Sequence, residues 1–337
     1  MRTALATFYP VTEDRLRFTR QLGITDGLLW GTTLPEISGL DFKKLLDIRG
    51  RFEGHGLRLF AIETLPTQFM RPIILGGDER DAHLQILKRI VRDMGRAGIA
   101  VLGYNWMVDG VWRTSNDFPL RGGARGTLVD AAALAHAPET HGRRYTEEEV
   151  WSNFERFLDE VLPIAVEEGV TLALHPNDAP VAEVAGVPAL FSNKEAFDRA
   201  LSYRDTPFNA LCLCLGNWGA MGEDLPSVVR EYGTRQRIAY VHFQAVQGSI
   251  PADGRFNECF VDEADNDALE IMKALHAVEF SGVMIPGHVP QMEGDSEWRT
   301  AESSTFTPYS HPMGGHRARA YTIGYLQGLI KAVRAFS

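Results

Sequence analysis

Eight short apolar runs alternate with helical patterns along almost the whole chain, and this alternation constrains the fold more than any other feature. Strands that are separated by helices favour a parallel sheet with the helices packed outside it. The expected strands are Thr3–Phe8, Asp26–Trp30, Leu57–Glu63, Ile99–Tyr104, Val170–His175, Leu211–Cys214, Ile238–Phe243 and Gly282–Pro286.

Eight βα units in one chain predict a (β/α)8 TIM barrel of the α/β class. A doubly wound open sheet is the competing architecture, but it usually has fewer strands and places its ligand at one switch point. Polar candidate residues end at least five of the runs, which favours a barrel rim, and no Gly-x-Gly-x-x-Gly follows the first run. The expected helices are Thr12–Leu22, Phe42–His55, Glu79–Ala97, Thr146–Glu168, Lys194–Ser202, Asp265–Ala277 and Ala318–Phe336.

The 337 residues predict a single barrel domain spanning 1–337, because no linker, repeat or low-complexity segment divides the chain. Two connections, 106–144 and 287–316, are long and rich in polar and turn-forming residues. Long connections of this kind are usually functional or disordered. On a barrel we expect them to lie over the C-terminal face as lids.

The composition limits the kinds of partner and the cellular compartment that we expect for the protein. A formal net charge of -10 argues against a nucleic-acid or anionic-membrane partner. The three cysteines show no framework spacing, which is typical of a reducing compartment. No run of about 18 apolar residues occurs, and the N-terminus lacks the features of a signal peptide, so the expected location is the cytoplasm.

Three successive runs end in a potential metal ligand: His175, Cys214 and His242. Imidazole and thiolate are good ligands for a divalent transition metal, which would act as a Lewis acid on a substrate oxygen. The alternative is a buried cysteine with two hydrogen-bonded core histidines. However, burying several polar imidazoles side by side in a water-free core is unfavourable. Cys212 is interpreted as a core residue that points to the opposite side of the strand from Cys214.

Ionisable residues near other strand ends are candidates for catalysis. Glu63 and Glu258 could each be a ligand, an acid-base group or a structural anchor, and Glu63 needs a partner because it ends an apolar run. His288 follows the eighth run, where an imidazole suits proton transfer near neutrality, although a surface-loop histidine is an equal alternative. His311 and His316 precede the last helix, and His316 is either a catalytic group or an ordinary N-terminal helix residue.

Candidates for substrate binding follow the fourth run and two later ones: Tyr104, Asn105, Arg113, Asn217 and Glu258. Arg113 could hold a substrate carboxylate in a bidentate pair. The alternative for Arg113 is a place on the surface of a lid.

Motifs along nearly the whole chain resemble those of the mannonate dehydratases of hexuronate breakdown. They are Glu63-Thr-Leu-Pro, Arg96-Ala-Gly-Ile, Tyr104-Asn105-Trp106-Met107, Trp112-Arg113-Thr114, His175-Pro-Asn-Asp178-Ala-Pro, Gly186-Val-Pro, Cys214-Leu-Gly-Asn217, Tyr240-Val-His242-Phe and Met272-Lys-Ala-Leu. The resemblance implies a xylose-isomerase-like barrel, a divalent metal and the dehydration of D-mannonate to 2-keto-3-deoxy-D-gluconate. The expected ion is Mn²⁺, with Fe²⁺, Co²⁺ and Zn²⁺ as alternatives, and a homodimer is compatible with the family.

Carried over by position, the resemblance implies three metal ligands, which are His175, Cys214 and His242, and makes His288 an acid-base candidate. The family's aspartate before that histidine, expected to be a fourth protein ligand, is Gly287 here. The family's catalytic tyrosine has no clear match before the last helix, where His316 or His311 could replace it.

The leading hypothesis is a metal-dependent sugar-acid dehydratase, a hydro-lyase of carbohydrate metabolism. A base would remove the proton on C2 and a second group would protonate the leaving hydroxyl on C3, with the metal holding the C1 carboxylate. A sugar isomerase or epimerase on the same barrel is the second hypothesis, because that chemistry also moves a proton beside a metal-held oxygen. The third is an altered paralogue that binds a sugar acid without turnover.

Overall fold

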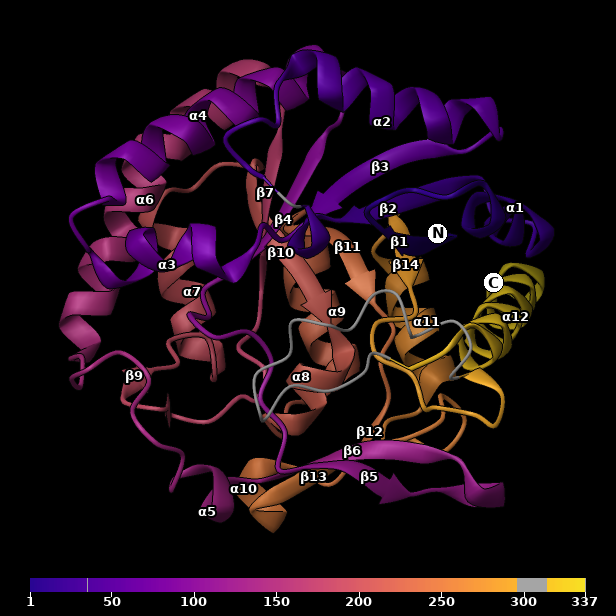
Figure 1. The fold of residues 1–337 in the computed structure, drawn as a ribbon. Helices are drawn as coiled ribbons and strands as arrows, with labels where there is room; N and C mark the ends of the chain where they lie inside the picture. Colours follow the sequence, from indigo (N-terminus) through magenta and orange to yellow (C-terminus); the bar gives the residue numbers. More distant parts are fainter. Residues whose placement is uncertain (35, 296–313, 337) are drawn as a thin grey trace.

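The computed structural model of the chain describes residues 1–34, 36–295 and 314–336. At its centre is a closed barrel of parallel strands, ordered β1-β14-β11-β10-β7-β4-β3-β2 (Figure 1). The strands are β1 (Arg2–Phe8), β2 (Asp26–Trp30), β3 (Arg58–Glu63), β4 (Val101–Asn105), β7 (Thr171–His175), β10 (Asn209–Cys214), β11 (Ile238–His242) and β14 (Val283–Ile285). The predicted TIM barrel is confirmed, and each expected run forms one of its strands.

Helices surround the barrel (Figure 1). They are α1 (Glu13–Gln21), α2 (Phe42–Gly54), α3 (Thr67–Leu75), α4 (Arg80–Arg96), α6 (Glu147–Glu168), α7 (Lys194–Tyr203), α8 (Leu215–Ala220), α9 (Leu225–Thr234), α11 (Ala268–Ala277) and α12 (His316–Phe336). Local signals explain several starts: Thr146 and Glu149 form a capping box at α6, and Asp224 caps α9. The short helices α3, α8 and α9 were not expected from the sequence.

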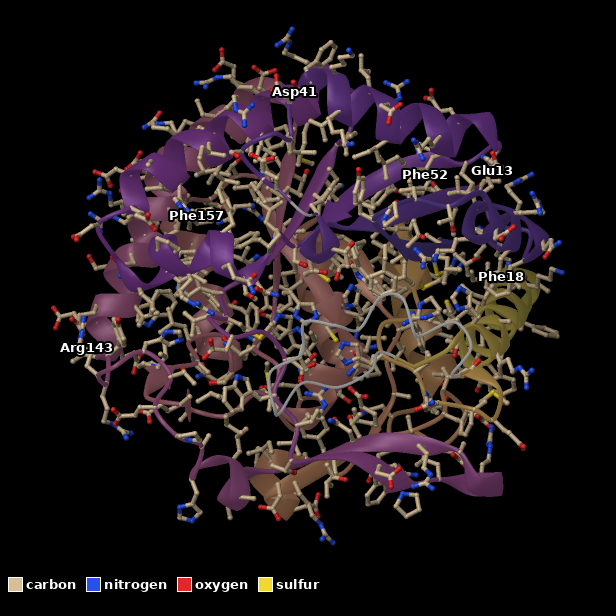
Figure 2. All side chains as sticks on the ribbon, viewed as in Figure 1. Glu13, Phe18, Asp41, Phe52, Arg143 and Phe157 are labelled. Carbon is tan, nitrogen blue, oxygen red and sulfur yellow. The ribbon has the colours of Figure 1, made fainter. Side chains whose placement is uncertain are left out.

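Alternation along the strands divides the core into two layers. One set of side chains fills the barrel, and the other packs between the strands and the helices, where Phe52 and Phe157 lie (Figure 2). The charged Glu13 and Arg143 lie at the periphery of the same view. Inside the barrel, Gly103 makes room for Tyr240, because a Cβ on that glycine would lie 2.1 Å from the tyrosine hydroxyl.

A second, antiparallel sheet stands beside the barrel, at the bottom of the view in Figure 1. Its strands, in spatial order, are β12 (Val246–Gln247), β13 (Arg255–Glu258), β6 (Arg125–Asp130) and β5 (Ser115–Pro119), and a hairpin of β8 (Glu183–Val184) and β9 (Val187–Pro188) lies elsewhere. The predicted lid 106–144 thus contains β5, β6 and the short helix α5 (Ala131–Leu134), while α10 (Ile250–Asp253) precedes β13.

The lid function of 106–144 stays a prediction. Most of the second predicted lid, 287–316, lies outside the described residues, as does His311. Among the helices that the structure describes, none is both long and apolar enough to cross a membrane.

Candidate metal and acid-base site

The three predicted metal ligands meet at the carboxyl ends of β7, β10 and β11. In the parallel ladder Cys214 lies opposite His242, and His175 lies opposite Asn105 of β4. One nitrogen of each imidazole and the sulfur of Cys214 all lie within 4.8 Å of one another, and the three residues are buried. The strand ends therefore deliver two nitrogens and a sulfur to one point, as the sequence predicted.

The protonation states of this cluster suit a metal. His175 Nδ1 lies 2.7 Å from the carbonyl oxygen of Pro176, which can only accept, so Nδ1 carries the proton and Nε2 keeps its lone pair. Burial and the neighbouring His242 lower the pKa of His175 to about 4, so this imidazole is neutral at pH 7. Burial raises the pKa of the Cys214 thiol well above its usual value, and a bound cation is what would stabilise its thiolate.

Glu63 approaches the same cluster from the end of β3. Its Oε1 lies 3.0 Å from His242 Nε2, and its Oε2 is buried without a hydrogen-bond partner in the described part of the chain. Burial alone would raise the pKa of Glu63, but the imidazoles of His242 and His175 keep it below the usual value. Glu63 is thus an ionised carboxylate that can orient His242, in the way that carboxylates orient metal-bound histidines.

Cys212 corrects one sequence interpretation. It is buried in the core, as expected, but it faces the same side of β10 as Cys214, because residues two apart on a strand share a face. Its sulfur lies within 4.8 Å of a carboxylate oxygen of Glu63 and a ring nitrogen of His242, inside the barrel and below the ligand cluster.

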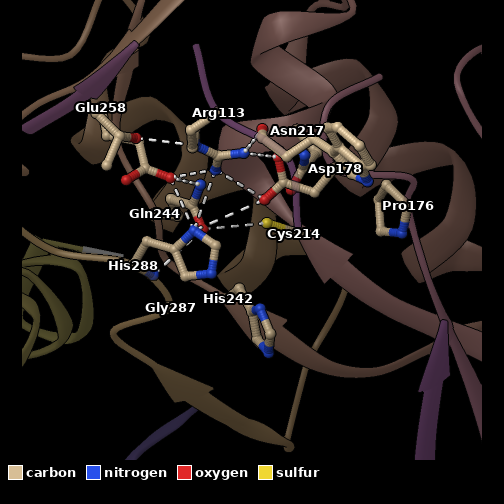
Figure 3. Close-up of polar contacts among 12 residues, drawn as sticks. Arg113, Pro176, Asp178, Cys214, Asn217, His242, Gln244, Glu258, Gly287 and His288 are labelled. Carbon is tan, nitrogen blue, oxygen red and sulfur yellow. Dashed lines mark hydrogen bonds and ion pairs between the residues drawn. The ribbon is translucent and has the colours of Figure 1, made fainter. Parts of the chain in front are cut away.

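A second cluster of charged groups adjoins the first (Figure 3). Arg113 is fully buried and donates to both oxygens of Asp178 at 2.5 and 2.9 Å, and to Glu258 Oε1 at 2.5 Å. Burial alone would raise the pKa of Asp178, but the guanidinium lowers it below the usual range. Carboxylates of the protein thus occupy the bidentate face of Arg113, and its pairing with a substrate carboxylate stays a prediction.

His288 joins this cluster through Glu258. His288 Nδ1 lies 2.7 Å from Glu258 Oε1 and 3.3 Å from Arg113 Nη2. The arginine contact would need Nδ1 as an acceptor, whereas the shorter contact with the carboxylate needs Nδ1–H as a donor, and the shorter contact decides the tautomer. His288 is thus a buried imidazole held by a carboxylate beside the ligand cluster.

Other predicted residues lie in different places. Tyr104 packs against Phe157 with a ring separation of 5.1 Å, so it lies in the layer between barrel and helices. Its role in substrate binding stays a prediction. Asn105 ends β4 at the rim. Asn217 lies at the start of α8, where its Nδ2 donates to the carbonyl oxygen of Asn177.

His316 begins α12 and packs against α1. Its ring packs edge-on against Phe18 of α1 at 4.9 Å. Burial, followed by the charges of Arg319 and Arg15, lowers the pKa of His316 to about 4. The structure thus favours the interpretation of His316 as an N-terminal residue of α12 that packs between helices.

Two residues of the site were missed from the sequence. Gln244, just after β11, contacts Cys214, Glu258 and His288. Arg319 of α12 is buried and donates to the carbonyl oxygens of Pro286 and of the residue that follows it, and its pKa is lowered to about 10 by burial. Gln244 could have been noticed because it follows a strand end; an arginine inside a helix gives no comparable signal.

Comparisons with known proteins identify similar chains and a matching family model. The family model for D-mannonate dehydratase (UxuA) matches residues 1–141 and 134–337. The chain is 25% identical to mannonate dehydratase 2 of Halalkalibacterium halodurans, covering 99% of both chains. It is 28% identical to mannonate dehydratase of Enterococcus faecalis, over 95% of this chain and 94% of that protein.

Solved structures show the same fold. The crystal structure of mannonate dehydratase from Streptococcus suis serotype 2 superposes with a TM-score of 0.85 at 25% identity, covering 99% of this chain and 94% of that one. A xylose isomerase domain protein from Planctomyces limnophilus superposes with a TM-score of 0.62 at 10% identity, covering 99% of both chains. The second likeness concerns the barrel alone.

Proposed function

Since the chain belongs to the D-mannonate dehydratase family, we propose that it dehydrates D-mannonate to 2-keto-3-deoxy-D-gluconate and water. The observation that carries the proposal is the meeting of three metal-ligand side chains with a carboxylate-held imidazole at one barrel rim. The first set can hold a Lewis acid, and the second can move a proton. A dehydration beside a carboxylate needs both.

The ligand set fits a divalent ion. His175, Cys214 and His242 offer two nitrogens and a sulfur within 4.8 Å of one another, and His175 already presents an unprotonated Nε2. When bound there, a divalent ion would polarise the substrate carboxylate and so acidify the proton on the neighbouring carbon. We propose Mn²⁺ as the ion, with Fe²⁺, Co²⁺ and Zn²⁺ as alternatives.

Proton transfer is assigned to His288. Because its Nδ1–H points to Glu258, Nε2 is the nitrogen that can take the proton from C2. The imidazolium formed in this way is stabilised by the Glu258 carboxylate and can return the proton to the hydroxyl that leaves C3 as water. Glu63, which the sequence suggested as a catalytic group, is proposed instead to orient His242, because their side chains are 3.0 Å apart.

A turnover assay with several substrates tests the proposal. Protein loaded with Mn²⁺ would be incubated with D-mannonate, with other aldonates and with ketohexoses, and 2-keto acid formation and sugar epimers would be followed. We expect 2-keto acid from D-mannonate. Epimerised sugar without any 2-keto acid would overturn the proposal in favour of the second chemistry that such barrels support. The homodimer and the cytoplasmic location remain predictions.

A further inference from the structure

The carboxamide of Gln244 lies beside the proposed metal ligands. Its Oε1 accepts one hydrogen bond from the thiol of Cys214, with 3.6 Å between sulfur and oxygen, and another of 3.2 Å from the backbone N–H of His288 (Figure 3). The side chain is buried. An oxygen with lone pairs therefore faces the sulfur that the proposed metal would bind.

The orientation of this amide is fixed from both ends. Nε2 of Gln244 donates to Glu258 Oε1 at 3.1 Å, while Oε1 accepts from the His288 N–H. A flipped amide would put its oxygen against the carboxylate and its NH2 group against a backbone N–H, and both contacts would be repulsive. The hydrogen-bond network thus directs the oxygen of Gln244, not its nitrogen, toward Cys214.

The distance between sulfur and oxygen suits two ligands of one ion. In a tetrahedral site with Zn–S of about 2.3 Å and Zn–O of about 2.1 Å, the sulfur and oxygen lie roughly 3.6 Å apart. Oε1 of Gln244 and Sγ of Cys214 are 3.6 Å apart in the structure.

Gly287 leaves the space that Gln244 occupies. A Cβ on Gly287 would lie 3.0 Å from Gln244 Oε1, 3.4 Å from Gln244 Cβ and 3.2 Å from His242 Cβ. The first and last of these distances are shorter than ordinary van der Waals contacts, so a Cβ at position 287 would require the amide oxygen and His242 to shift by a few tenths of an ångström.

We propose that Gln244 Oε1 is the fourth protein ligand of the metal and that Gly287 is the residue that makes room for it. The proposal rests on the proposed function only in taking His175, Cys214 and His242 as the other ligands. An amide is neutral, so the single thiolate leaves a divalent ion with a net positive charge. Such a centre attracts an anionic substrate group, which accords with a sugar acid.

Cobalt binding provides the test. The full-length protein, stripped of metal, would be titrated with Co²⁺. The thiolate-to-cobalt absorption reports coordination by Cys214, and competition with a chelator gives the Kd. The variants are Gln244→Leu, which removes the donor, Gln244→Glu, which keeps an oxygen, and Gly287→Ala, which crowds the amide. Gln247→Leu is the matched control, because Gln247 lies on β12 of the antiparallel sheet and donates to the backbone carbonyl oxygen of Glu263.

The expected pattern is specific. Gln244→Leu should weaken the Kd for Co²⁺ at least about tenfold. Gly287→Ala should do the same, and the double variant should lose no more than either single one, since both act on one ligand. Gln244→Glu should bind Co²⁺ more tightly than Gln244→Leu, because it keeps an oxygen toward Cys214, but less tightly than the unsubstituted protein, because its second oxygen meets the carboxylate of Glu258. The control should not change.

Two outcomes would overturn the assignment of Gln244: an unchanged Kd in Gln244→Leu, or binding by Gln244→Glu no tighter than by Gln244→Leu. The melting temperature of each metal-free variant shows whether it folds, and Gly287→Ala keeps the proposal testable if Gln244→Leu does not. Failure of the unsubstituted protein to bind Co²⁺ at all would instead remove the metal site of the proposed function, and the fourth ligand with it.

Discussion

His288 Nδ1 lies 2.7 Å from Glu258 Oε1, and the two residues come from different sheets. His288 follows the barrel strand β14, whereas Glu258 ends β13 of the antiparallel sheet beside the barrel. The antiparallel sheet therefore contributes to the site itself, because it supplies the carboxylate that fixes the tautomer of the proposed acid-base group. Arg113 and Gln244 both donate to the same carboxylate oxygen and hold it in place.

Replacing His288 by Gln should lower kcat by about 10²- to 10⁴-fold, because the group that moves the proton is lost. Binding of Co²⁺ should be unchanged, since the amide at position 288 leaves the backbone N–H and the three ligands in place. The measurement is D-mannonate turnover together with the Kd for Co²⁺. Full turnover by this variant would assign proton transfer to another residue.

Replacing Glu258 by Gln should leave His288 present but poorly oriented. We expect kcat to fall less than in His288→Gln, because the imidazole is kept but its tautomer is no longer fixed by a carboxylate. Turnover of D-mannonate by both variants checks this. A loss as large as in His288→Gln, or no loss at all, would contradict this orienting role of Glu258.

Replacing Arg113 by Met should destabilise the fold by about 3–5 kcal/mol at neutral pH, because two buried carboxylates lose their cation. The pKa of Asp178 is lowered in the folded protein, so its contribution to stability is present above the unfolded pKa of about 4 and is lost as the pH falls through the folded value.

The destabilisation caused by Arg113→Met should therefore shrink on acidification, because protonated carboxyl groups no longer need the guanidinium. Urea unfolding of both proteins between neutral pH and about pH 4 measures it. A difference in unfolding free energy that does not depend on pH would show that packing, not charge, is what the arginine contributes.

His316→Phe should flatten part of the pH dependence of stability. Burial lowers the pKa of His316 to about 4 in the folded protein, whereas an unfolded histidine titrates near 6.5. Between these values the unfolded state binds more protons, so His316 makes stability rise with pH in this window and adds no slope above it.

We expect a smaller slope in His316→Phe, whose ring can still pack against Phe18. His136→Phe, at an exposed position, is the control. Equal slopes in His316→Phe and the unsubstituted protein would contradict the assignment of a neutral, partly buried His316. Turnover of D-mannonate by His316→Phe should persist, because the ring at position 316 packs between helices.

The sequence predicted the parts of the site that follow directly from strand ends. His175, Cys214 and His242 each end an apolar run, and parallel strands bring such ends to one rim, so their meeting could be expected. The cluster around Arg113 could not, because Asp178 and Glu258 reach the guanidinium through connections whose path the periodicity does not specify. The layer that Tyr104 faces could not be predicted, because a tyrosine one residue before a strand end can face either layer, and one residue of register decides which.

The most direct test of the account is a metal titration of D-mannonate turnover by the stripped protein. We predict that turnover is absent without metal and rises with added Mn²⁺ until one ion is bound per chain, and that His175→Ala shows no turnover at any stage. Full turnover by stripped protein, or by His175→Ala, would contradict the claim that these barrel-rim side chains hold the ion that the reaction needs.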